Sequence, residues 1–216
     1  MPVRKIPKNY RNITGVASHL KANGQAMFES TLERDFLTLL EFDLSVESFE
    51  VQPVTIHWID NSDKARTYTP DVLVYFHRTN YPTTLYEVKY RSELRESWPE
   101  LKPKFRAALR YARSKGWRFK LITETEIRET HLKNAKFLLP FIKKGPASEA
   151  DMDILDRAIN SLTRSTPNEL LTHIYKDEWN RARLLPTLWY LIGTRQIAAD
   201  LNQPLTMSSA IWRLNA

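Results

Sequence analysis

The stretch LYEVKY, residues 85–90, constrains the fold more than any other part of this sequence. Its β-branched and aromatic residues are typical of a strand, and successive side chains of a strand point to opposite faces. Glu87 and Lys89 therefore share one face of an otherwise apolar segment. This placement has to be explained either by a function or by an ordinary ion pair.

Strand and helix patterns surround this segment. Three runs rich in Val, Ile, Thr and aromatic residues predict a meander, at 49–59, 68–76 and 84–91. Residues 98–116 then predict a helix that ends near Gly116, and residues 118–123 predict a strand. The helix is long enough to cross over to the same sheet, so the order of elements predicts an α/β fold.

A helical pattern precedes the strands. From Gln25 onward, apolar residues recur at intervals of three and four positions. Glu33 borders the apolar stripe that must face the sheet, which would bring its carboxylate toward the strands. The sequence STLE, residues 30–33, also matches a capping box in which Ser30 caps the helix and Glu33 reaches back. Both interpretations of Glu33 remain open.

Asp71 is a second acid at the entrance of a strand, because it follows Pro70 and precedes the apolar run VLV. A carboxylate at this place can share a metal ion with Glu87 on the neighbouring strand. Together these residues give the PD-(D/E)xK pattern of nucleases with a restriction-endonuclease-like core. The structural alternative is that Asp71 caps a turn after proline and that Glu87 and Lys89 form a surface pair of little energetic value.

The chemistry of phosphodiester hydrolysis explains each part of this pattern. A divalent cation neutralises the phosphate and acidifies a water molecule, and Mg²⁺ prefers carboxylate and carbonyl oxygens as ligands. Asp71 and Glu87 would hold the ion. Lys89 would orient the attacking water or balance the charge that develops on the phosphate.

The composition favours an anionic partner. Lys and Arg outnumber Asp and Glu by 32 to 25, for a net charge of +7. Cysteine is absent, which excludes disulfides, thiolate-bound zinc and a cysteine nucleophile, and the five histidines show no metal-site spacing. We expect DNA contacts from one face of the predicted helix and from a basic arm over residues 1–24, although a solvated face and a disordered arm explain the same charges. The predicted contacts are Lys102, Arg106, Arg110 and Arg113 on the helix and Lys5, Lys8 and Arg11 in the arm.

A shift in composition predicts two domains. Gly145, Pro146 and Ser148 precede a new acidic helix start, which places a boundary near residue 147. We expect an α/β domain over 1–147 and a smaller, mainly helical domain over 148–216 that ends in a hairpin of the winged-helix kind. The first residues are basic and polar, and no apolar run approaches the length of a membrane span, so we expect a soluble cytoplasmic protein without a membrane partner.

In consecutive blocks from about residue 4 to residue 140, the chain resembles the TnsA family. These proteins are endonuclease subunits of heteromeric transposases in bacterial cut-and-paste transposons, including CRISPR-associated ones. The blocks include STLERDFLTLLEFD, YTPDVLV, YEVKYR and LKPKFRAALRYARSKGWRFKLITE. The sequence YLIGTRQIAADLNQPLTMSSAIW resembles the second, winged-helix-like domain of the family.

The resemblance implies a magnesium-dependent endonuclease with two Mg²⁺ ions. It assigns catalytic roles to Glu33, Asp71, Glu87 and Lys89, and metal ligation to the three acids and the peptide carbonyl of Val88. Some members carry glutamine where this chain has Glu87. The resemblance further implies cleavage at the 5′ ends of the transposon strands, a TnsB-like DDE transposase that handles the 3′ ends, and a TnsC-like AAA+ regulator that contacts the C-terminal domain.

Two other functions fit the same residues. One is a self-sufficient repair or restriction nuclease with the same active site. The other is a DNA-binding adaptor without catalytic activity, in which the acids are structural.

Overall fold

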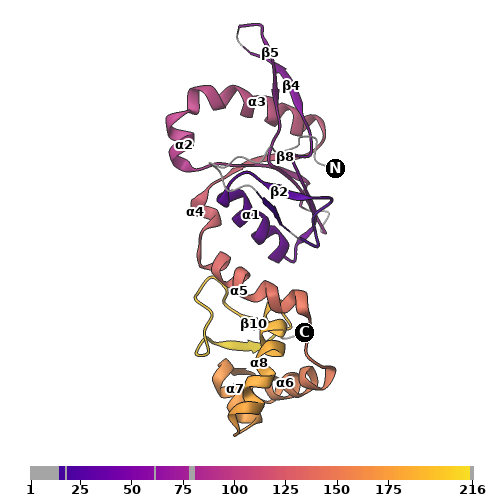
Figure 1. The fold of residues 1–216 in the computed structure, drawn as a ribbon, viewed down its shortest axis with the longest axis vertical. Coiled ribbons are helices and arrows are strands. Elements are labelled where there is room, and N and C mark those ends of the chain that lie inside the picture. Colours follow the sequence, from indigo (N-terminus) through magenta and orange to yellow (C-terminus); the bar gives the residue numbers. More distant parts are fainter. Residues whose placement is uncertain (1–14, 18, 61, 78–80, 215–216) are drawn as a thin grey trace. The chain divides into compact units, whose positions relative to one another are not determined.

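The computed structural model describes residues 15–17, 19–60, 62–77 and 81–214. The chain forms two compact units, Met1–Arg128 and Glu129–Ala216, shown in Figure 1. The division therefore lies upstream of the boundary expected near residue 147. The predicted DNA contacts at Lys5, Lys8 and Arg11 lie outside the described residues.

A four-stranded sheet forms the centre of the first unit, in the order β3-β6-β7-β8. Its strands are β3 (Val46–Val51), β6 (Val72–Phe76), β7 (Thr84–Val88) and β8 (Arg118–Ile122). The first three strands are antiparallel, whereas β7 and β8 run parallel and are connected through α3 (Trp98–Ser114). The predicted α/β order with a crossover helix is thus present in the structure.

The predicted strand over residues 49–59 is two strands of different sheets. β3 ends at Val51, and Gln52 adopts a positive φ of 50° just before Pro53, so the chain leaves the central sheet at this point. Downstream, β4 (Ile56–Ile59) pairs with β5 (Ala65–Tyr68) in a separate antiparallel hairpin. The hairpin extends from the unit in Figure 1, and its Ile59 side chain is exposed.

The predicted helix begins later than Gln25. Residues Ala26–Phe28 form strand β2, which pairs with β1 (Gly15–Ala17), and α1 occupies Thr31–Phe42. The helix starts where the Ser30 side chain caps it by accepting a hydrogen bond from the Glu33 N–H. The apolar face of α1 is buried, including Leu32, Phe36 and Leu37.

Helix α3 covers the sheet with the apolar face that the sequence predicts. Phe105 and Ala108 are buried with Leu73 and Leu85 of the central strands in one apolar cluster. The remaining elements of this unit are α2 (Arg91–Glu96) and α4 (Glu124–Ile127).

The second unit is mainly helical. Its elements are α5 (Thr130–Lys144), α6 (Glu149–Leu162), β9 (Arg164–Ser165), α7 (Pro167–Ile174), α8 (Glu178–Gly193), β10 (Ile197–Ala199) and β11 (Ile211–Arg213). The three short strands form an antiparallel sheet in the order β10-β11-β9.

Helix α5 belongs to this second unit, which explains the position of the division between units. Its apolar residues Leu138 and Ile142 approach Gly193 of α8, and a Cβ added at Gly193 would lie 2.8 Å from Ile142. Asn134 of α5 is buried and donates hydrogen bonds of 2.8 Å to the Leu201 and Gln203 carbonyls. The break at Gly145 ends this helix, but the helix packs with the residues that follow it.

In the part of the chain that the structure describes, no helix combines the length and the apolar character needed to cross a membrane.

Candidate active site

Asp71 lies at the start of β6 and reaches toward the end of β7. Its backbone N–H donates to the Tyr86 carbonyl at 3.1 Å, which fixes the residue beside β7. Its carboxylate Oδ2 accepts a hydrogen bond of 2.7 Å from the Val88 N–H. The two strands that the sequence predicts to carry the acids are therefore linked at the site itself.

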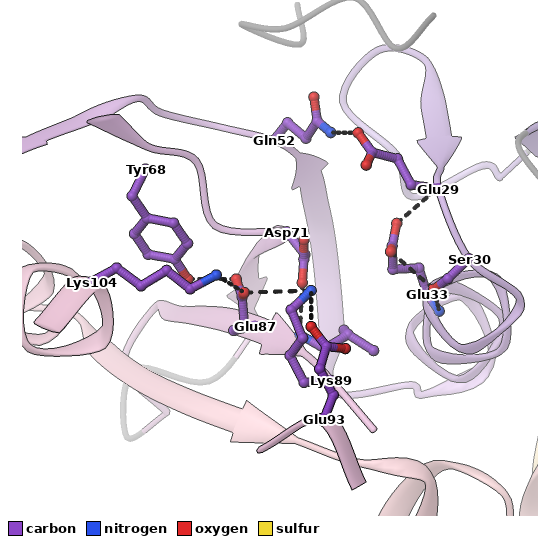
Figure 2. A network of polar contacts seen from close by, with 11 residues as sticks. Glu29, Ser30, Glu33, Gln52, Tyr68, Asp71, Glu87, Lys89, Glu93 and Lys104 are labelled. Carbon is purple, nitrogen blue, oxygen red and sulfur yellow. Dashed lines mark hydrogen bonds and ion pairs between the residues drawn. The ribbon is translucent and has the colours of Figure 1, made fainter. Parts of the chain in front are cut away.

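Glu87 is the most deeply buried acid of the site, with 2% of its surface exposed. Figure 2 shows three groups directed at its carboxylate. The Tyr68 hydroxyl donates a short hydrogen bond to Oε2, while the amines of Lys104 and Lys89 lie 3.5 Å and 3.7 Å from Oε1. A buried carboxylate needs such partners because burial without them is strongly unfavourable.

Lys89 follows β7 directly and lies among the acids. Its amine is 3.7 Å from Glu87 and 4.0 Å from Glu93. Burial lowers the pKa of Lys89, but the charges of Asp71, Glu87 and further carboxylates outweigh this effect, so that the pKa lies above its usual value. Beside these carboxylates Lys89 is therefore a cation at neutral pH and can donate hydrogen bonds.

The surroundings of Asp71 raise the pKa of its carboxyl group. Burial raises the pKa of Asp71 well above its usual range, and the charges of Glu87 and Glu33 raise it further. Lys89 and the Val88 N–H act in the opposite direction. A carboxyl group with this environment is a candidate functional group, because a bound cation would relieve the repulsion.

Glu33 reaches back to the start of α1, as one of the two interpretations predicts, whereas its role as a metal ligand stays a prediction. Its carboxylate accepts from the Ser30 hydroxyl at 2.9 Å and from the Glu29 N–H at 2.8 Å, so it closes the N-terminus of α1. Burial raises the pKa of Glu33, hydrogen bonds from Glu29 and Ser30 oppose this, and the charge of Lys89 lowers it as well. Glu33 thus supports the Ser30 cap of α1, and its pKa responds to the charge of Lys89.

The donor set matches the chemistry of a hard divalent cation. Buried carboxylates that repel one another, together with nearby peptide carbonyls, are the oxygen ligands that Mg²⁺ accepts. Among the described side chains, however, no three acids or histidines are arranged together to hold a metal ion. The acids instead have internal partners, with Lys89 and Lys104 at Glu87 and Ser30 at Glu33.

Two residues of the site, Lys104 and Tyr68, were not predicted from the sequence. Lys104 lies on the inner side of α3, and its amine is also 5.0 Å from the centroid of the Tyr68 ring. A signal for Lys104 existed, since it lies within one helical turn of Leu101, Phe105 and Ala108 and so interrupts an apolar stripe with a cation. Tyr68 gives no such signal in the sequence.

The predicted DNA contacts on α3 do not join the acid cluster. Lys102, Arg106, Arg110 and Arg113 are all exposed on one face of the helix. At 3.6 residues per turn, this face lies opposite to Lys104. The basic residues on the exposed face of α3 are therefore separate from Lys104, which contacts Glu87.

Two family models match most of this chain. A model described as "TnsA-like endonuclease N terminal" matches residues 43–124, which include Asp71, Glu87 and Lys89. A second model, "TnsA endonuclease C terminal", matches residues 126–201. No curated protein matches the chain. The chain therefore belongs to the TnsA family, whose endonuclease domains identify it as an endonuclease subunit of a transposase.

Proposed function

We propose that this chain is the magnesium-dependent subunit of a heteromeric transposase that hydrolyses the 5′ strand ends of a transposon. The observation that carries the proposal is the gathering of Asp71, Glu87 and Lys89 at adjoining ends of β6 and β7. This is the order of residues expected of a PD-(D/E)xK core, inside the segment that matches the N-terminal family model.

The residues divide into metal ligands and a charge-stabilising group. Asp71, Glu87, Glu33 and the Val88 carbonyl would hold up to two Mg²⁺ ions, which neutralise the scissile phosphate and acidify a water molecule when bound. The neighbouring acids raise the pKa of Lys89, which favours the protonated amine. It would donate hydrogen bonds to a phosphate oxygen and stabilise the charge that develops there.

Tyr68 would act as a positioning residue through Glu87, because its hydroxyl donates to Oε2 and limits the orientations that the carboxylate can adopt. The Lys104 amine, 3.5 Å from Oε1, would instead balance the charge of Glu87 when no cation is bound. A ligand carboxylate that is held in place loses less conformational freedom when a cation binds.

We assign the second unit to partner binding. Its helices and the small β10-β11-β9 sheet suit a winged-helix-like domain, and its match to the C-terminal family model favours a TnsC-like AAA+ regulator as the partner. A TnsB-like DDE transposase would cut and join the 3′ ends in the same complex, in the bacterial cytoplasm. The exposed basic face of α3 would add contacts to the DNA backbone.

A cleavage assay scored strand by strand tests this proposal. The complete transposase, assembled with Asp71→Ala or Lys89→Ala, should lose the cuts at the 5′ ends and retain joining of the 3′ ends. Unchanged cleavage of the 5′ ends in both variants would favour the adaptor function. Efficient cleavage by the purified chain with Mg²⁺ alone would favour a self-sufficient nuclease.

A further inference from the structure

An open pocket lies on the first unit next to the acid cluster. Its cavity volume is about 590 Å³, and it is lined by Arg91, Leu94, Arg95, Trp98, Thr123 and Glu126. This volume falls within the roughly 300–1,000 Å³ of typical ligand sites. We refer to it below as the α2 pocket.

The α2 pocket adjoins the site through the ends of β7 and β8. The Lys89 N–H donates to the Ile122 carbonyl at 3.1 Å. Arg91 and Thr123 follow these two residues closely in the chain, and both line the pocket. A ligand in the pocket would thus lie close to Lys89, which contacts Glu87.

The cations of the pocket are available to a ligand. Arg91 and Arg95 are exposed, and neither has an ion pair with any residue in the described ranges. Arginine is well suited to phosphate because its guanidinium presents several N–H groups in a fixed plane.

The indole of Trp98 offers a stacking surface. Trp98 is 41% exposed, although its ring lies 6.1 Å from the ring of Phe105, measured between centroids. The contact with Phe105 holds the indole in place, which reduces the entropy lost when a flat ligand stacks on it.

Glu126 supplies an acceptor on the other side of the pocket. Its Oε2 accepts hydrogen bonds from the Thr123 N–H at 2.9 Å and from the Thr123 hydroxyl, which lower the pKa of Glu126. Its second oxygen, Oε1, makes no hydrogen bond to another described residue. A charged acceptor would disfavour a simple anion, but it suits the amino group of a nucleobase.

We propose that the α2 pocket binds one unpaired nucleotide of the DNA strand next to the scissile phosphate. Arg91 and Arg95 contact its phosphate, Trp98 stacks on its base, and Glu126 accepts from an exocyclic amine. The nucleotide is unpaired because a paired base keeps its face inside the duplex stack. This inference rests on the proposed function, in which the neighbouring acids cut DNA.

A fluorescent base tests the pocket independently of cleavage. The full chain is titrated with a single-stranded DNA of about ten nucleotides that carries one central 2-aminopurine, a length within the range that compact single-strand sites cover. Stacking on Trp98 should quench the emission of the base. Trp98→Ala should abolish the quenching and weaken binding about tenfold, as expected for the loss of one stacked base. Arg91→Ala and Arg95→Ala should each lower the salt dependence of binding by about one counterion.

Matched controls separate the α2 pocket from general effects. Trp179→Ala removes another exposed indole, in the second unit, and Arg66→Ala removes an exposed arginine that already pairs with Asp60 at 2.8 Å. Both should quench and bind as the wild type does. Equal quenching by wild type and Trp98→Ala would overturn the inference, even where the same preparations cut transposon ends. Quenching that depends on Trp98 without any cleavage by the assembled transposase would instead refute the proposed function and leave the nucleotide site standing.

Discussion

Removal of the Tyr68 hydroxyl tests whether Glu87 depends on the partners that the fold supplies. The hydroxyl donates to Oε2 of a carboxylate with only 2% of its surface exposed. In Tyr68→Phe the ring keeps its packing beside Phe105, with the centroids 6.3 Å apart, and only the hydrogen bond is lost. The variant therefore isolates one interaction of the site.

The structure sets the expected size of the effect. A hydrogen bond to a charged group contributes about 1.5–3 kcal/mol, and a buried acceptor without a partner cannot recover this energy from water. Two amines remain near Oε1, at 3.5 Å and 3.7 Å, and limit the loss. We therefore expect Tyr68→Phe to lower the free energy of unfolding by about 2 kcal/mol at neutral pH.

Urea unfolding of the full chain at neutral pH measures this change, and Tyr75→Phe is its matched control. Tyr75 also donates to a carboxylate, that of Glu50, at 3.1 Å, but both of these residues are only partly buried. The control should lose about 0.5 kcal/mol, because water can replace the lost donor. If the two variants lose the same free energy to within about 0.5 kcal/mol, burial does not make Glu87 dependent on Tyr68, and our account of the site is wrong.

Three further predictions concern Lys104, Asp71 and Asn134. Lys104→Met removes an amine that lies 3.5 Å from Glu87, so the variant should bind Mg²⁺ several-fold more tightly when measured by calorimetry. Weaker binding would contradict a competition between this amine and the metal ion. Burial raises the pKa of Asp71, so the folded state holds more protons than the unfolded state as pH rises above about 4, and the free energy of unfolding without metal should fall as pH rises. Asp71→Asn should flatten this fall and raise the free energy of unfolding near pH 8 by about 1–2 kcal/mol, as urea unfolding at several pH values would show. An unaltered pH dependence would contradict this role of Asp71. Asn134→Ala removes hydrogen bonds to Leu201 and Gln203 and should destabilise the second unit by about 2–4 kcal/mol, as hydrogen exchange of that unit would show; unchanged protection would contradict it.

The parts of the site that could be predicted from the sequence are those set by local periodicity. Strand alternation places Glu87 and Lys89 on one face, and the structure brings their charged groups to 3.7 Å. Asp71 was predicted from its position before an apolar run, and it meets the Val88 N–H at 2.7 Å. In each case a few neighbouring residues determine where the side chain points.

The positions of Tyr68 and Lys104 in the site depend instead on contacts between segments that are distant in the sequence. Tyr68 lies in β5, which pairs with β4 in a separate hairpin. Pro53 interrupts the run over residues 49–59, but strand propensity does not tell that its two halves join different sheets. The direction of the Lys104 side chain depends on the rotation of α3 about its axis, and the packing of Phe105 and Ala108 on the sheet sets this rotation. Propensity and spacing do not contain this information.

The boundary between the two units could not be located from the helix end at Gly145 alone. Gly145, with a φ of 77°, does end a helix, as the composition predicts. A helix end becomes a domain boundary only when the helix packs with the residues before it. Helix α5 packs with α8 through Ile142 and Gly193, so the division falls before α5 at residue 128.

The hydrogen bonds of the site bear on how an endonuclease of this kind would be controlled. Each proposed carboxylate ligand already has a partner within the chain: Glu33 has Ser30, Asp71 has the Val88 N–H, and Glu87 has Tyr68 and two lysines. A cation that binds these oxygens must compete with the partners, which lowers its apparent affinity for the free subunit. Any contact from DNA or from another subunit that draws Lys89 or Lys104 away from Glu87 would strengthen metal binding by the same free energy. The proposed dependence of cleavage on an assembled complex thus has a physical basis in the two lysines, and Lys104→Met should reduce that dependence.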